Sequence, residues 1–171
     1  MTRIRLAEPA DAEAIAAAEM RTAETPGLLV GRPGEIPAQA YRDKIVKLAQ
    51  HGRYIVAEED GEVIGHAMLD PMPMRANAHV FTLTIVVHPG HTGRGVGKAM
   101  LRDLLEWAEH DPRVRKIELN VRAGNERAQG LYRRMGFVEE ARFRKRVHRL
   151  DGEYEDDLGM AWFPARPDVR A

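Results

Sequence analysis

Glycines gather where an apolar run ends and a helix-like stretch begins. The apolar run covers residues 80–87, and Gly93, Gly95 and Gly97 follow shortly after it. Because glycine reaches positive φ and carries no Cβ, successive backbone N–H groups in such a turn can converge on an anion. The positive end of the helix dipole adds to this attraction. We therefore expect the turn to hold the phosphates of a ligand.

The spacing of these glycines narrows the choice of ligand. A Walker loop needs Ser or Thr after its Gly-Lys pair to bind magnesium, but Lys98 is followed by Ala99. A dinucleotide fold needs G-x-G-x-x-G near its first strand and an acidic residue about 20 positions later. Here the pattern is G-x-G-x-G in mid-chain, and Glu118 is the nearest acid on a plausible strand. A Walker nucleotide-binding loop and a dinucleotide-binding fold are therefore both disfavoured.

The composition sets outer limits on fold and function. The 171 residues suit one domain with a single substantial core, which we expect over 1–163, with a loose tail at 164–171. Lys plus Arg and Asp plus Glu both number 26, so no overall field favours nucleic acid or membranes. With no apolar stretch near 18 residues and no leader-like N-terminus, we expect a cytoplasmic protein without membrane contact.

Cysteine and histidine usage excludes several kinds of site. The chain has no cysteine, which excludes disulfides, thiolate metal sites and a thiol nucleophile. His88 and His91 stand three positions apart, a spacing that metal ligands can use, but no third ligand lies nearby. We therefore expect both histidines to be exposed to solvent, and we expect no metal site.

Hydrophobic periodicity and turn residues predict the element order βααβββαβαββ. A first strand around residues 4–6 precedes helices over about 10–23 and 38–50. A hairpin over 54–69 turns at Asp60-Gly61, and a long strand covers about 78–87. A helix from the glycine turn to Asp111, a strand over 116–121, a helix over 126–135 and a final hairpin complete the chain. This order predicts an α/β fold with a mixed, mostly antiparallel sheet.

Three segments of the chain form a joint pattern. They are Ile85-Val86-Val87-His88-Pro89 leading to the glycine turn, Leu119-Asn120-Val121-Arg122-Ala123-Gly124-Asn125, and Ala128, Leu131-Tyr132 and Met135-Gly136-Phe137. In this order they resemble the GNAT superfamily of acetyl-coenzyme A-dependent N-acetyltransferases. The resemblance covers about residues 54–160, and it implies a three-layer fold in which the fourth and fifth strands splay apart. The end of the chain is similar to the branch that includes amino-acid and ribosomal-protein N-terminal acetyltransferases.

The resemblance implies acetyl-coenzyme A as the cofactor. Backbone groups of Ile85, Val86 and Val87 would pair with its pantetheine arm; a plain buried strand is the compatible alternative. Asn125 would also contact the cofactor. The family loop opens with Gln or Arg where this chain has Thr92, so one side-chain contact should be weakened or replaced by Arg94 or Lys98. The implied pyrophosphate residues are Gly93, Arg94, Gly95, Val96, Gly97 and Lys98.

Tyr132 is the implied general acid. Its position in the third segment matches the family tyrosine that protonates the departing thiolate. A phenol has an ordinary pKa of about 10, so it is protonated at neutral pH. The alternative is a tyrosine that merely packs in the core.

The sequence leaves the identity of the general base undecided. Related ribosomal-protein acetyltransferases carry a catalytic glutamate where this chain has Asn120. An amide cannot take a proton, but it could position a water or the amine, or serve a structural role. His79, at the start of the central strand, could act as a base or simply form a hydrogen bond. A proton relay through solvent with no dedicated base is the further alternative.

Asp156 is a candidate for binding the substrate amine. Pairing the last two strands around Asp151-Gly152 sets Val147 opposite Asp156 and leaves this carboxylate among apolar neighbours. A buried acid there would need a raised pKa or a charged partner, and it could instead anchor Lys145. In the family, the loop at 26–37 and the last hairpin shape the acceptor site.

Two functions follow from these residues. The first is an enzyme that moves acetyl from acetyl-coenzyme A to the primary amine of a small molecule, an amino acid or a protein N-terminus by direct attack. The second is a non-catalytic acyl-coenzyme A sensor or partner-binding domain, which Asn120 keeps open. Either function is compatible with a homodimer. We expect no nucleic-acid partner for either function.

Overall fold

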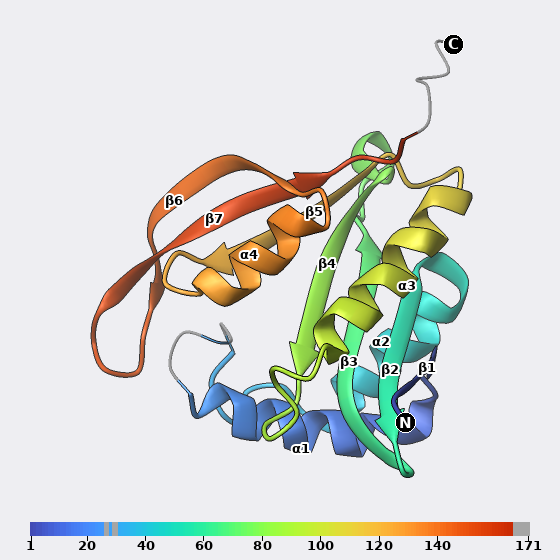
Figure 1. The fold of residues 1–171 in the computed structure, drawn as a ribbon, viewed down its shortest axis with the longest axis vertical. Helices are drawn as coiled ribbons and strands as arrows, with labels where there is room; N and C mark the ends of the chain where they lie inside the picture. The colour runs from blue at the N-terminus through green and yellow to red at the C-terminus, as the bar shows by residue number, and fades with distance from the viewer. Residues whose placement is uncertain (26–27, 29–30, 166–171) are drawn as a thin grey trace.

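The computed structural model describes residues 1–25, 28 and 31–165, whose strands form one seven-stranded sheet in the order β1-β2-β3-β4-β5-β7-β6 (Figure 1). The strands are β1 (Arg3–Leu6), β2 (Arg53–Glu59), β3 (Glu62–Pro71), β4 (Val80–Val87), β5 (Lys116–Arg122), β6 (Val138–His148) and β7 (Tyr154–Trp162). The helices are α1 (Ala12–Ala23), α2 (Ala38–His51), α3 (Val96–His110) and α4 (Glu126–Arg134), with short 3-10 turns at Pro9–Asp11 and Arg75–Asn77.

The predicted fold class and element order are confirmed. Every paired neighbour in the sheet is antiparallel except β4 and β5, which are parallel and joined through α3. Part of the predicted tail, at 166–171, and residues 26, 27, 29 and 30 of the acceptor loop lie outside the described residues. Within the described part of the chain, no helix is both long and apolar enough to cross a bilayer.

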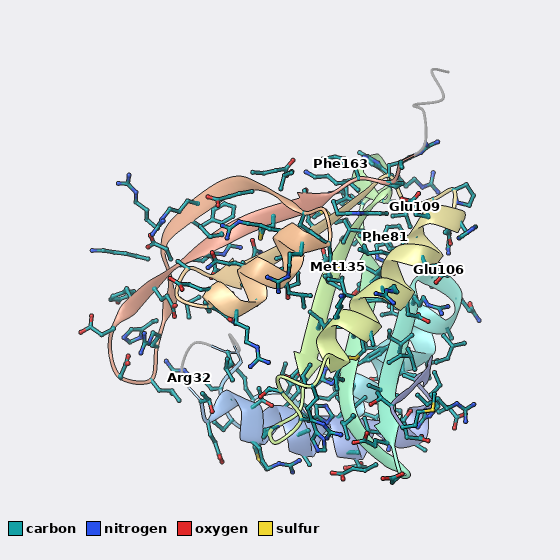
Figure 2. The ribbon with its side chains drawn as sticks, in the orientation of Figure 1. Arg32, Phe81, Glu106, Glu109, Met135 and Phe163 are labelled. Atoms are coloured by element: carbon teal, nitrogen blue, oxygen red, sulfur yellow. The ribbon has the colours of Figure 1, made fainter. Side chains whose placement is uncertain are left out.

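Two apolar clusters cover the two faces of the sheet. The larger cluster packs α3 and α4 on one face, where Figure 2 labels Phe81 of β4. The ring of Phe81 meets that of Trp107 in α3 edge-on, with 6.0 Å between the ring centroids. The smaller cluster packs α1 and α2 on the other face, around Ile15, Tyr41 and Leu48. The strands β2 and β3 are therefore buried between two helical layers, as the resemblance implied, whereas β6 at the edge of the sheet is largely exposed.

β4 and β5 separate after a short parallel contact. They pair only from Val80 opposite Lys116 to Thr82 opposite Glu118. Beyond Thr82, β4 stays with β3 as far as Val87, and β5 stays with β7 as far as Arg122. The facing edges of the two strands therefore carry backbone groups that do not pair with each other. The predicted splay of the fourth and fifth strands is confirmed.

A β-bulge shifts the register of the last hairpin. Val147 pairs with Glu155, whereas the simple hairpin register placed it opposite Asp156. The register shifts between Phe143 and Val147, where Lys145 has a left-handed φ of 51°. The backbone N–H of Lys145 donates to Asp156 Oδ1 at 2.8 Å. Three residues of β6, 144–146, face the single residue Asp156 of β7, so the bulge holds two extra residues and sets Lys145 against the Asp156 carboxylate.

Candidate active site

The glycine turn opens directly onto the N-terminus of α3. Gly90, Gly93 and Gly95 have φ values of 87°, 85° and 84°, which side-chain-bearing residues rarely adopt. Gly95 is the N-cap and makes no side-chain cap, so the first N–H groups of α3 stay available to a ligand. A Cβ on Gly97 would lie 3.4 Å from Val87 Cγ2, so its absence lets α3 start close to the end of β4. The turn fits a phosphate group.

The cation beside this turn comes from α4. Arg94 is directed elsewhere: its Nη2 donates to Glu59 at 2.6 Å. Arg127, by contrast, places Nη2 3.0 Å from the position a Cβ on Gly93 would take. Sequence reasoning missed Arg127, because only the packing of α4 beside the turn brings it there. Its place near the start of α4, soon after Asn125, is the one signal that could have suggested it.

Asn125 links the end of β5 to α4. Its Oδ1 accepts a hydrogen bond from the backbone N–H of Ala128 at 3.1 Å and so caps the helix. The capping role uses the carbonyl oxygen and leaves the amide N–H groups as donors. The same side chain can therefore cap α4 and donate to a ligand in the splay.

Tyr132 is buried in the larger core. Its side chain is 8% exposed, and its ring lies 5.6 Å from that of Phe137. Burial raises the pKa of Tyr132 to about 12, since the phenolate would be poorly solvated. The hydroxyl is protonated throughout the physiological range. The core role and the role of proton donor are compatible in this position.

The model of the acetyltransferase (GNAT) family matches residues 17–137. The chain belongs to this family. An L-amino acid N-acetyltransferase, AaaT, of Escherichia coli is 35% identical over 64% of this chain and 67% of its own length. The N-alpha-acetyltransferase RimI of Mycobacterium tuberculosis is 33% identical over 60% of this chain and 61% of its own length. The alignments thus span about two thirds of these relatives.

A solved GNAT structure shares the fold across the whole chain. The structure of yncA from Salmonella typhimurium with its cofactor acetyl-CoA has a TM-score of 0.87, at 20% identity, over 99% of both chains. At 20% identity this likeness establishes the shared fold and nothing further.

The two candidates for the base lie at different ends of the splay. Asn120 is exposed on β5 beyond the point of separation, opposite Gly159. It shares a face of β5 with Glu118 and Lys116, which pair with each other at 2.7 Å. His79 is exposed just before β4, at the end where β4 still pairs with β5. The GNAT fold brings Asn120, and not His79, to the open part of the splay.

Asp156 does not lie in an apolar environment, because of the bulge in β6. Its Oδ2 accepts from Arg142 Nε at 2.8 Å, beside the bond from Lys145 described above. These bonds, the backbone one first, lower the pKa of Asp156 below its usual value. The buried acid is Asp157, which is 2% exposed and lies 2.6 Å from Arg122 Nε. Asp156 anchors the bulge, and its predicted apolar setting is wrong.

His88 is buried, which corrects the expectation of an exposed residue. It is 2% exposed, its Nδ1 lies 2.9 Å from the carbonyl oxygen of Val63, and its Nε2 lies 3.1 Å from His66 Nδ1. Pairing of β3 with β4 brings the two histidines together. His91 stays partly exposed and contacts Arg94. Within residues 1–25, 28 and 31–165, no group of three or more potential ligands is arranged for a metal ion.

Acid is expected to destabilise the protein through His88. Burial, followed by the charge of His66, lowers the pKa of His88 from 6.5 to about 4. Between these values the unfolded chain binds more protons than the folded one, so the free energy of unfolding falls as pH falls. Neutral His88 makes its full contribution to the free energy of unfolding above pH 6.5, and this contribution is lost as the pH falls toward 4.

Thermal melting of the wild type and His88→Gln at several pH values between 7 and 4 measures this effect. The fall in Tm should be shallower in the variant, whose side chain does not titrate. Parallel curves for the two proteins would contradict the assignment.

Proposed function

We propose that this chain is an acetyl-CoA-dependent N-acetyltransferase that moves acetyl to a primary amine by direct attack. The observation that carries the proposal is the separation of β4 from β5 beside the uncapped, glycine-lined start of α3, in a chain of the GNAT family. The unpaired strand edges suit an extended amide-bearing arm, and the turn suits a pyrophosphate.

The residues divide the binding of acetyl-CoA between them. When bound, acetyl-CoA supplies an acetyl group activated as a thioester. Backbone groups of Ile85, Val86 and Val87 would bind the pantetheine arm, and the amide N–H groups of Asn125 would add a donor. Arg127 would neutralise phosphate charge that the backbone N–H groups of the turn share. The backbone donors of the turn are those of Gly93, Arg94, Gly95, Val96, Gly97 and Lys98.

Two side chains would act on the reacting groups. Tyr132 would donate its proton to the sulfur as the thiolate departs, because burial keeps the phenol protonated. Asn120 would orient the amine or a water that receives its proton. The sequence holds no cysteine, in keeping with direct attack by the amine.

The names of the relatives point to the class of acceptor. The name of one specifies L-amino acids, and the name of the other specifies an α-amine. Both acceptors present a primary amine, which is ammonium at neutral pH. We therefore propose an amino acid or a protein N-terminus, or a small amine of similar shape, as the acceptor.

Release of coenzyme A thiol in the presence of amines tests the proposal. The panel should contain L-amino acids, short peptides with free N-termini and simple alkylamines. Turnover with at least one primary amine is expected. Tight binding of acetyl-CoA with no turnover of any amine would favour the non-catalytic sensor instead.

Replacing Arg127 by alanine is expected to raise the KM for acetyl-CoA by about tenfold, as a lost charge-assisted contact to phosphate would. The kcat should change little, because the guanidinium of Arg127 lies beside Gly93 of the glycine turn and would contact phosphate rather than the reacting groups. Arg94→Ala is the matched control, since that guanidinium is bonded to Glu59. Equal rises in the two variants would contradict a specific role for Arg127.

A further inference from the structure

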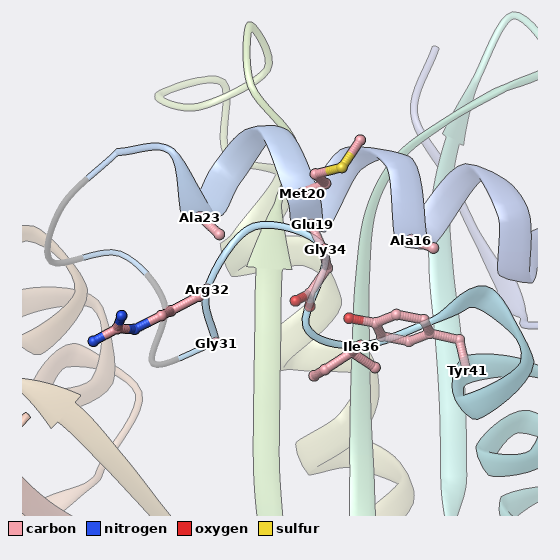
Figure 3. Close-up of a pocket in the computed structure, with 9 residues that line it drawn as sticks. All are labelled: Ala16, Glu19, Met20, Ala23, Gly31, Arg32, Gly34, Ile36 and Tyr41. Atoms are coloured by element: carbon pink, nitrogen blue, oxygen red, sulfur yellow. The ribbon is translucent and has the colours of Figure 1, made fainter. Parts of the chain in front are cut away.

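A small cavity lies between α1 and the segment at 31–36, on the face of the sheet where α1 and α2 pack. Its free volume is about 20 Å³, which is room for about one water. Figure 3 shows the carboxylate of Glu19 and the hydroxyl of Tyr41 turned toward this space. Glu19 Oε1 lies 2.9 Å from His66 Nε2, so the carboxylate already has a partner within the fold. The packing of α1 therefore explains this cluster without an organic ligand.

Another buried polar side chain, that of Gln129, lies close to the proposed cofactor site. Gln129 belongs to α4 and is 6% exposed. Its Nε2 donates to the carbonyl oxygen of Ala123 at 2.8 Å and to that of Arg122 at 3.1 Å. An amide nitrogen carries two hydrogens, so each carbonyl receives one of them. Gln129 thus binds the turn that joins β5 to α4.

The partners of Gln129 fix the orientation of its amide. Both backbone carbonyls only accept, so the nitrogen and not the oxygen must face them. The amide oxygen, Oε1, faces Arg133, whose Nη2 lies 3.4 Å away. A carboxylate of the same length would set a negative charge against two carbonyl oxygens, and a methionine would leave both without these donors. The position therefore favours a neutral side chain that donates two hydrogen bonds.

The turn is held from its other side by β7. The N–H of Ala123 donates to the carbonyl of Asp156 at 2.9 Å, and the N–H of Gly124 donates to Glu155 Oε1 at 3.1 Å. A Cβ on Gly124 would lie 2.8 Å from that oxygen, so the glycine allows the close approach. Gln129 holds carbonyl groups of the turn while β7 holds its N–H groups, and together they restrict its movement.

This turn sets the start of α4, from which two groups would reach acetyl-CoA. The N–H of Asn125 donates to the carbonyl of Arg122 at 3.0 Å, the same oxygen that the side chain of Gln129 binds. The carbonyl of Asn125 in turn accepts from the backbone N–H of Gln129 at 3.1 Å. Two residues after Asn125, the guanidinium of Arg127 lies beside Gly93 of the glycine turn. A shift of the β5–α4 turn would therefore displace Asn125 and Arg127 together.

We propose that Gln129 is a positioning residue for acetyl-CoA: its amide locks the β5–α4 turn so that the side chains of Asn125 and Arg127 face the cofactor. Because both amide hydrogens are used within the fold, Gln129 acts through these two side chains rather than by direct contact. Tyr132 lies further along α4, where its ring packs against Phe137, so the turn affects it less. The inference rests on the proposed function, which assigns Asn125 and Arg127 to the cofactor.

Calorimetric binding of coenzyme A to Gln129→Met tests this role without turnover. Methionine matches glutamine in length and helix preference but donates no hydrogen bond. The Kd should rise about three- to tenfold, as the loss of roughly one hydrogen bond to the ligand would cause. Gln39→Met, the same change at an exposed glutamine of α2, should leave the Kd unchanged. A Kd within about twofold of the wild-type value in folded Gln129→Met would overturn the proposal.

A double variant separates positioning from a general loss of stability. Because Gln129 acts in part through Arg127, adding Gln129→Met to Arg127→Ala should raise the Kd by less than the product of the two single effects. Single effects that multiply in full would overturn the proposal. Ile45→Ala, in the core under α2, should lower the Tm without changing the Kd, which shows that lower stability alone does not weaken binding.

Steady-state kinetics supply a second readout. In Gln129→Met the KM for acetyl-CoA should rise as the Kd does, while kcat stays within about twofold, because Tyr132 keeps its packing. A fall in kcat with an unchanged KM would overturn the positioning role.

Gly124→Ala approaches the turn from the side of β7. Its Cβ would displace the carboxylate of Glu155 and loosen the turn, so the Kd for coenzyme A should rise here too. If Gln129→Met does not fold, an unchanged Kd in Gly124→Ala would overturn the proposal. If the wild type binds coenzyme A but acetylates no amine, the proposed function fails, and the Kd values alone decide the role of Gln129. Absence of coenzyme A binding by the wild type would overturn both.

Discussion

Replacing Tyr132 by phenylalanine is expected to lower kcat at least about tenfold, and by as much as about 10²–10⁴ if proton donation to the leaving thiolate limits the rate. The ring is retained, so packing against Phe137 and the core of α4 should survive. Only the proton donor is lost. The KM for acetyl-CoA should change little, because the hydroxyl acts on the developing thiolate rather than on the bound thioester.

The measurement is a comparison of kcat, both KM values and thermal melting for wild type and Tyr132→Phe. A pH profile adds a second readout, because the pKa of about 12 places the loss of the phenolic proton above the working range. Wild-type activity should therefore show no fall from Tyr132 near pH 9. Unchanged turnover in the phenylalanine variant would remove Tyr132 as the acid.

Replacing Asp157 by alanine is expected to lower the free energy of unfolding by about 3–5 kcal/mol, the range for breaking a buried ion pair from one side. Asp157 and Arg122 are 2% and 6% exposed, and their charges lie 2.6 Å apart. One Arg122 nitrogen, Nη1, is buried without a hydrogen-bond partner among the described residues. Losing Asp157 would remove the carboxylate at 2.6 Å from the buried Arg122 guanidinium and leave the half-buried Glu155 to balance its charge.

Urea unfolding of three variants separates the ion pair from other effects. Asp156→Ala is the matched control, because that neighbouring carboxylate is held at the surface by Arg142 and Lys145 and should cost much less. The double variant Arg122→Met with Asp157→Leu should recover most of the stability lost in Asp157→Ala. A loss below about 1 kcal/mol in Asp157→Ala, the level of an exposed pair, would show that the pair is not effectively buried.

Much of this fold is predictable from local patterns. Alternating and 3.6-residue periodicities, with Gly and Pro at the breaks, predict the element order that the structure shows. The hairpin turn at Asp60-Gly61 is formed by two residues of positive φ, as its sequence indicates. These features depend on neighbours in the chain, so the sequence alone determines them.

The backbone geometry of the proposed cofactor site is predictable for the same reason. The glycines of the turn, the cap residue Asn125 and Tyr132 act through positions fixed within one turn or one helix. Contacts between elements are different. Arg127 lies beside the glycine turn, and Glu19 beside His66, only because elements far apart in the chain pack together.

The last hairpin shows why the alternation of residues along a strand does not predict which charged side chains are buried. Period-2 alternation places Asp156 among apolar neighbours, but the bulge in β6 sets Arg142 and the backbone N–H of Lys145 against its carboxylate. Likewise, His88 looks like a loop residue, and only the pairing of β3 with β4 buries it against His66. The sequence by itself determined the family, the element order and the phosphate turn, which depend on short-range geometry. Strand register and helix packing decided which acids and histidines are buried, because burial is set by contacts that only the assembled sheet brings together.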